Sequence, residues 1–139
     1  MALQQVAVNY LSVLFAAIAS MILGFLWYGP LFGKAWVKLS GISKKDIGKA
    51  KKEGMGRKYF FEFLTALIMA YVLAHFANYV QATTITDAFA LGFWAWLGFI
   101  ATVQLGIVLW EGRTFKLYLL KAGYYLVELV IMAIILTFY

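Results

Sequence analysis

The chain has 139 residues, of which 65% are hydrophobic and only 13% are charged. This composition lies far outside that of soluble globular domains. The chain contains no cysteine, which excludes disulfides, thiol redox chemistry and thiolate metal sites. Its formal charge of +6 is better explained by a basic loop beside anionic lipid head groups than by nucleic acid, which we do not expect as a partner.

Four long apolar stretches follow one another along the chain, at 6–28, 59–79, 88–110 and 117–139. As an α-helix with a rise of about 1.5 Å per residue, each one spans the ~30 Å hydrocarbon core of a bilayer. The strands of a transmembrane barrel are shorter and alternate in polarity, whereas these stretches are apolar on every face. The first stretch is too long for a signal peptide and follows no basic residue, so we expect it to be retained. The sequence predicts an all-α, integral membrane four-helix bundle that forms a single domain over 1–139.

The basic residues predict the orientation of this bundle. Nine of the twelve Lys and Arg residues lie in loop 29–58, and the connection 80–87 has none. The other three are Arg113, Lys116 and Lys121. Basic loops favour the cytoplasmic side, so we expect loop 29–58 inside and both termini on the non-cytoplasmic side. Segment 34–58 should lie against anionic lipid. We expect a multi-pass protein of a prokaryotic cytoplasmic membrane.

Small residues recur every four positions in three of the stretches, as Ser12, Ala16, Ser20 and Gly24, as Ala66, Ala70 and Ala74, and as Gly98, Thr102 and Gly106. Residues four apart lie on one helix face, so each row forms a ridge where another backbone can approach closely. This pattern predicts tight internal packing, with one ridge left for a neighbouring subunit. The protein is therefore expected to form a homo-oligomer or to join a membrane complex. The pattern leaves open which ridge is internal.

The end of the first stretch carries the string Trp27-Tyr28-Gly29-Pro30-Leu31-Phe32-Gly33-Lys34-Ala35-Trp36. This string resembles the signature of a family of small four-span membrane proteins catalogued as domain of unknown function 1761. The length, the basic loop after the string and the four-span plan are also similar, so the resemblance covers essentially the whole chain. It implies a membrane location and this topology, and it implies no activity, substrate or catalytic residue.

Physically, the string predicts the end of a helix followed by a turn. Pro30 lacks a backbone N–H and restricts Gly29, and both Gly29 and Gly33 permit conformations that other residues avoid. The aromatic residues would anchor the turn at the membrane interface, through Trp27, Tyr28 and Trp36. The alternative is a re-entrant turn or gate, which must be buried in protein or face water.

Three polar residues are expected close to the cytoplasmic ends of their helices. Polar and ionisable side chains inside a bilayer are costly unless they are paired or hydrated, so each is a candidate site. Glu62 and Lys121 lie about one turn inside their stretches, and Gln104 lies about 9 Å from the same side. We expect the three to meet, with Glu62 and Lys121 as an ion pair. The alternative is the mouth of a polar pathway.

Glu128 is expected about 16 Å inside the membrane, near the midplane. Desolvation disfavours the charged form of a carboxyl group, so we expect it to be protonated. It is either hydrogen-bonded to a neighbouring helix or part of a site that handles protons or cations. His75 and Asn78 form an outer polar pair at i and i+3, which we expect to form hydrogen bonds at the interface and to bind no metal.

The chain has no phosphate loop, dinucleotide fingerprint or Ser-His-Asp arrangement. We therefore expect no enzymatic activity and no cofactor. Two functions stay open. The sequence favours a non-catalytic accessory or self-assembling subunit of a membrane complex. The alternative is a small oligomeric transporter or channel for protons, cations or a small solute that uses Glu128.

Overall fold

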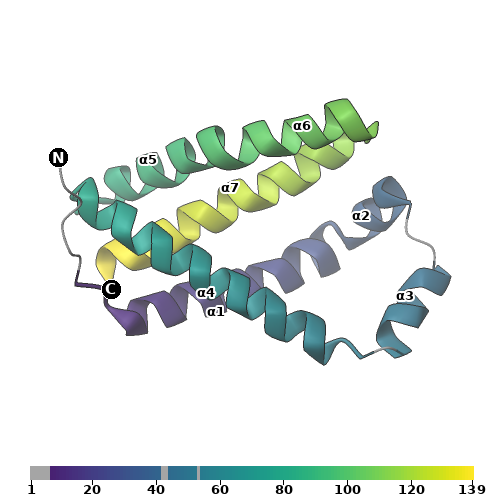
Figure 1. Ribbon diagram of the computed structural model, residues 1–139, viewed down its shortest axis with the longest axis horizontal. Coiled ribbons are helices and arrows are strands. Elements are labelled where there is room, and N and C mark those ends of the chain that lie inside the picture. The colour runs from purple at the N-terminus through teal and green to yellow at the C-terminus, as the bar shows by residue number, and fades with distance from the viewer. Residues whose placement is uncertain (1–6, 42–43, 53) are drawn as a thin grey trace.

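The computed structural model describes residues 7–41, 44–52 and 54–139, and these are almost entirely helical (Figure 1). The elements are α1 (Tyr10–Leu26), the π-helical turn η1 (Trp27–Leu31), α2 (Gly33–Ser40), α3 (Lys44–Lys52), α4 (Gly56–Tyr79), α5 (Ile85–Trp96), the π-helical turn η2 (Leu97–Ala101), α6 (Thr102–Glu111) and α7 (Phe115–Phe138). Within the described part of the chain, four continuous helices are long and apolar enough to cross a membrane: Tyr10–Leu31, Gly56–Tyr79, Ile85–Glu111 and Phe115–Phe138. The predicted all-α, four-span membrane fold is confirmed.

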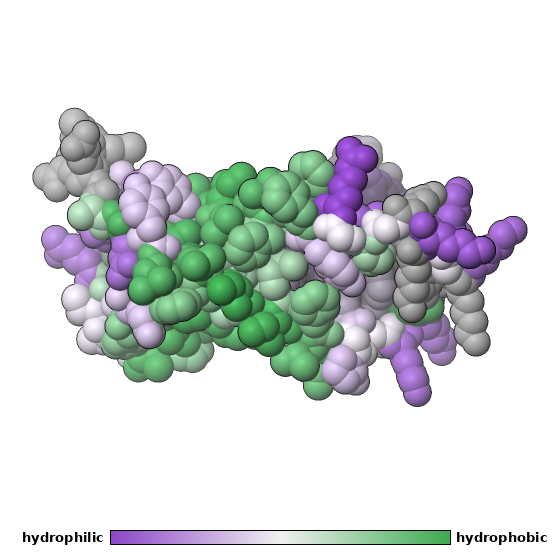
Figure 2. All heavy atoms as spheres, turned by 90° about the horizontal axis from the view of Figure 1, so that it is seen from below, coloured by the Kyte–Doolittle hydropathy of each residue, from purple (hydrophilic) through white to green (hydrophobic). Residues whose placement is uncertain are grey.

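Helix α7 lies at the centre of the bundle. It packs against α1, α4 and α5, while α1 also packs against α4. The continuous helix formed by α5, η2 and α6 runs along α7 on the other side (Figure 1). Apolar residues cover the middle of the molecule, and hydrophilic residues gather at the two ends of its long axis (Figure 2). This distribution suits a bundle that crosses a bilayer along its long axis.

The helix termini extend or shorten the predicted spans for local reasons. The first span begins at Tyr10, since the Asn9 side chain caps the helix by accepting from the backbone N–H groups of Leu11 and Ser12. Residues 7–9 precede the helix, and position 6 lies outside the described residues. The third span begins at Ile85 rather than at 88, because Thr84 opens the helix with a capping box.

The core between α1, α4 and α7 is built from small side chains. Ala16, Ala17, Ala70 and Ala133 are fully buried there, together with Met132. Small residues allow helix backbones to approach closely, and in lipid this van der Waals contact is the main force between helices. The ridges on α1 and α4 are therefore internal to the bundle.

The ridge on the third span faces outward. A Cβ atom added at Gly98 or Gly106 would meet no atom within 4 Å outside its own helix. The contact of α5 with α7 instead uses Gly92, where an added Cβ would lie 2.8 Å from the Cα of Val130. Of the three small-residue ridges, the one on the third span is therefore the ridge that does not pack inside the bundle.

Candidate functional site

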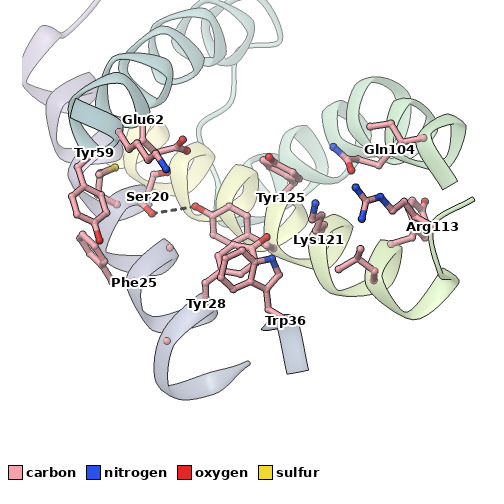
Figure 3. Close-up of a pocket in the computed structure, with 18 of the residues that line it drawn as sticks. Ser20, Phe25, Tyr28, Trp36, Tyr59, Glu62, Gln104, Arg113, Lys121 and Tyr125 are labelled. Carbon is pink, nitrogen blue, oxygen red and sulfur yellow. Dashed lines mark hydrogen bonds between the residues drawn. The ribbon is translucent and has the colours of Figure 1, made fainter. Parts of the chain in front are cut away.

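A cavity of about 820 Å³ lies at the end of the bundle that carries the basic loop. It is bounded by α1, α2 and α4 on one side and by α6 and α7 on the other (Figure 3). At this end α4 diverges from α6 and α7 (Figure 1). The volume is within the range of about 300–1,000 Å³ that is typical of sites for small molecules.

The three polar residues that the sequence placed near this end all line the cavity. Glu62 reaches it from α4, whereas Gln104 and Lys121 reach it from α6 and α7. Figure 3 shows Glu62 on the side opposite the other two. In the described part of the chain no ion pair joins Glu62 to Lys121, so that expectation was wrong. The cause is the divergence of α4 from α6 and α7, which places the cavity between the two side chains.

Glu128 lies beneath the cavity, on α7. Its side chain is only 4% exposed, and the side chains of Ser20 and Tyr124 lie near enough to interact with its carboxyl group. Both of these residues line the cavity. Ser20 belongs to α1 and Tyr124 to α7, so the carboxyl group lies at the contact between these two helices. A short polar connection therefore runs from the cavity to the buried carboxyl group.

Tyr124 holds this connection in place. Its hydroxyl donates to the backbone carbonyl of Ser20 at 3.4 Å, the bond drawn in Figure 3. Gly24 lies beside it on α1, where an added Cβ would come within 3.2 Å of the Tyr124 hydroxyl. Gly24 therefore makes room for Tyr124 between α1 and α7.

The first helix ends within the Trp27–Trp36 string, as the sequence predicted, but at Leu31, which lies beyond the predicted end of the span at Tyr28. Pro30 has no N–H to donate, and the backbone widens into the π-helical turn η1, in which the Phe32 N–H donates to the Trp27 carbonyl at 2.8 Å. A Cβ at Gly33 would lie 2.8 Å from the Tyr28 carbonyl oxygen, so the chain needs glycine there to begin α2. A re-entrant turn is not formed, because Trp27–Leu31 continues the first span.

The aromatic residues of the string pack against α7 and form one wall of the cavity. The indole N–H of Trp27 donates to the Leu120 carbonyl at 3.2 Å. The Tyr28 ring lies 5.2 Å from the Tyr124 ring and 5.4 Å from the Trp36 ring, centroid to centroid. Tyr28 and Trp36 both line the cavity. The string therefore connects the first span to α7, which interface anchoring alone would not require.

Sequence reasoning missed two tyrosines and undervalued two other residues. Tyr124 and Tyr125 line the cavity, and Arg113, which we had used only for topology, lines it as well. Ser20 had been assigned only to a packing ridge. Tyr124 and Glu128 are spaced as i and i+4, which places them on one helix face, so this spacing could have indicated Tyr124.

The outer polar pair does not form a shared site. The Nδ1 of His75 lies 2.9 Å from the Tyr71 carbonyl of its own helix, and its ring packs on the Tyr71 ring at 4.7 Å. Asn78 instead lines a second, smaller cavity of about 210 Å³, together with Asn9. Among the residues that the structure describes, no three or more His, Cys, Asp or Glu side chains are grouped to hold a metal ion.

Residues 11–137 match the family described as protein of unknown function (DUF1761). The match includes the Trp27–Trp36 string and extends over all four membrane-compatible helices. The chain therefore belongs to this family, as its resemblance to the family signature indicated. No curated protein and no solved structure matches the chain.

Proposed function

We propose that this member of the DUF1761 family is a non-catalytic membrane protein that carries a small solute across the bilayer, with Glu128 as the buried carboxyl group of the pathway. The observation that carries this proposal is the connection from a cavity of about 820 Å³, through Ser20 and Tyr124, to Glu128. A carboxyl group at this depth is costly to bury, and such groups in membrane proteins mark ion and substrate pathways. A purely structural contact would not need the adjoining cavity.

The cavity is closed toward the other end of the molecule, and this supports a transporter rather than an open channel. Ala16, Ala70, Met132 and Ala133 are all fully buried in the core beyond it. A second cavity of about 210 Å³ lies at the opposite end. Passage of a solute would require the core between the two cavities to part, as in the rocking of one bundle half against the other.

The basic loop supports a cytoplasmic opening of the large cavity. Lys58 and Arg113 lie at this end of the bundle and line the cavity. Basic residues favour the cytoplasmic side, which would place both termini outside and the solute entrance in the cytoplasm of a prokaryotic cell. Anionic lipid at segment 34–58 would hold this end at the membrane surface.

A second candidate function is an accessory or self-assembling subunit of a membrane complex. It is favoured by the outward-facing ridge of Gly98, Thr102 and Gly106, where the helix offers a smooth surface to another backbone. A partner protein that co-purifies from native membranes in fixed stoichiometry would favour this role. A homo-oligomer that transports a solute would combine the two functions, since four spans enclose little volume.

Proton movement across liposomes tests the role of Glu128. The purified protein is reconstituted with pyranine inside the vesicles, and a panel of small organic anions, cations and neutral solutes is added outside in turn. We expect at least one solute class to drive proton movement, and Glu128→Gln to abolish it, because the amide cannot take up and release a proton. The matched control is Glu111→Gln, which removes an exposed carboxyl group at the cavity rim and should leave the movement intact.

Two results would contradict the proposal. The first is a wild-type protein that moves protons with no member of the panel. The second is a Glu128→Gln variant that folds and behaves as the wild type does. The melting temperature of each variant in detergent separates loss of the pathway from loss of the fold.

A further inference from the structure

We propose that the large cavity binds an amphipathic anion, whose carboxylate or phosphate-type group is held by Lys121 with the help of Gln104 and Arg113. This inference deepens the proposed function, because it assigns a class of ligand to the same cavity. It rests on binding alone, so it can be tested apart from transport.

Lys121 forms no ion pair with any residue that the structure describes. It lies about one turn into the apolar helix α7, is partly buried and lines the cavity. Glu62 lies across the cavity from it (Figure 3). An ammonium group inside a membrane-spanning helix is costly unless it is hydrated or paired. An anion bound in the cavity would supply the missing charge.

Two further donors lie on the same wall. Gln104 on α6 and Arg113 in the connection to α7 extend toward the space that Lys121 faces (Figure 3). A guanidinium group offers five N–H donors in a planar fork that matches carboxylate and phosphate oxygens, and an amide adds two more donors. The three side chains can therefore surround one anionic group.

The remaining charges of the cavity favour a ligand with a small negative charge. Lys58 adds a third cation to the lining, and Glu62 and Glu111 contribute two carboxyl groups. Positive charge is thus in excess by one, with Glu62 on the wall opposite Lys121. A compact, singly charged group at Lys121 fits this arrangement better than a highly charged one, which the two carboxyl groups would repel.

The rest of the cavity is suited to an apolar chain. Met21 and Phe25 line it from α1, and Ile107, Val108 and Leu117 line it from α6 and α7. Burial of such a chain stabilises binding in proportion to the apolar area removed from water. A ligand that places an anionic group on Lys121 and an apolar chain against these residues is amphipathic.

The cavity lies between two helices, α4 and α6, that do not pack closely on each other. Helix α4 packs against α1 and α7, and α6 packs against α7, but no extensive packing joins α4 to α6. Glu62 and Gln104, which line the cavity from these two helices, lie on opposite sides of it (Figure 3). An amphipathic anion is soluble in water and partitions into a bilayer, so both sources must be tested.

The first arm of the test measures a water-soluble amphipathic anion. Octanoate is titrated into the protein in dodecyl maltoside at pH 8. Binding is followed by the tryptophan fluorescence of the protein, to which Trp36 in the cavity contributes. We expect saturable binding of octanoate, and none of octylamine or octanol in the same range. Lys121→Gln should weaken octanoate binding about tenfold, which corresponds to ~1.4 kcal/mol. Lys121→Arg should restore most of it.

The matched control is Lys116→Gln, which removes the same charge from an exposed site on α7 that does not line the cavity. It should leave the affinity unchanged. Arg113→Gln removes an exposed cation that does line the cavity and should weaken binding about threefold, or ~0.65 kcal/mol. Because Arg113 is exposed, this variant keeps the test decisive even where Lys121→Gln fails to fold.

The second arm distinguishes a lipid from a soluble ligand. The protein is reconstituted in bilayers of phosphatidylcholine and phosphatidylglycerol, released into the gas phase and weighed by native mass spectrometry. Phosphatidylglycerol retained by the wild type and lost in Lys121→Gln would identify the anionic group as a lipid head group. Octanoate binding without retained phosphatidylglycerol would identify a soluble amphiphile.

Equal binding of octanoate and octylamine would overturn the proposal. The proposal would also be overturned if Lys121→Gln and Arg113→Gln bound octanoate and phosphatidylglycerol as the wild type does. Anion binding without proton movement would uphold this inference and refute the proposed transport.

Discussion

Gly92→Ala is expected to loosen the contact between α5 and α7. Gly92 is buried, and a Cβ added there would lie 2.8 Å from the Cα, 2.9 Å from the Cγ2 and 3.0 Å from the backbone nitrogen of Val130. The shortest of these distances is about 0.7 Å below the ~3.5 Å at which carbon atoms attract each other best. Two of the three atoms are backbone, so a change of rotamer cannot relieve the clash. The two helices must move apart.

The expected cost follows from two opposing effects. Overpacking of a well-packed contact costs about 1–3 kcal/mol. Replacement of glycine by alanine within a helix returns roughly 0.5–1 kcal/mol through the lower flexibility of the unfolded backbone. The midpoints of the two effects differ by about 1 kcal/mol, and the free energy of unfolding should fall by about that amount.

Unfolding by sodium dodecyl sulfate in mixed micelles, followed by circular dichroism, measures this change. The control is Gly106→Ala on the same span, where an added Cβ meets no atom within 4 Å outside its own helix. Gly106→Ala should be neutral or slightly stabilising, so only Gly92→Ala should lower the free energy of unfolding. If Gly92→Ala unfolds at the same concentration of dodecyl sulfate as Gly106→Ala, the close packing of α5 on α7 is refuted.

Further substitutions address the Trp27–Trp36 string and the contact between α5 and α7. Gly33→Ala places a Cβ 2.8 Å from the Tyr28 carbonyl and should lower the free energy of unfolding by about 1–3 kcal/mol, whereas Gly29→Ala meets no atom within 4 Å and should be neutral. Equal stabilities in the same dodecyl sulfate titration would show that only the string's aromatic residues matter for packing. Trp96→Phe removes the indole N–H that donates to the Ala122 carbonyl at 2.7 Å and should cost about 0.5–1.5 kcal/mol. A variant as stable as the wild type would mean that the bond adds nothing to the α5–α7 contact.

The Trp27–Trp36 string shows how far local sequence reasoning reaches. The sequence located a break in regular helix at Pro30, since proline cannot donate a backbone hydrogen bond at any position. It did not predict that the helix would absorb the break as a π-helical turn and continue to Leu31. That outcome depends on α7, because the Trp27 indole bonds to the Leu120 carbonyl and Tyr28 packs against Tyr124.

In the candidate site, too, the sequence predicted one feature and the tertiary structure decided another. Depth along each helix can be computed from residue number, so the sequence brought Glu62, Gln104 and Lys121 to one end of the bundle, where the cavity lies. The distance across the bundle cannot be computed in that way. The structure separates Glu62 from Lys121 by a cavity, and the expected ion pair is not formed.

The sequence by itself determined that this chain is a bundle of four membrane-compatible helices. The hydrophobic effect and the cost of an unsatisfied backbone in lipid act on each stretch separately, so length and hydropathy are sufficient. Only the tertiary structure decided which ridges are internal, where the bundle opens, and that Glu128 is buried next to Ser20 and Tyr124, which line a cavity. These features depend on close van der Waals contacts and crossing angles between helices distant in the chain, where a single methyl group at Gly24 or Gly92 would change the fit.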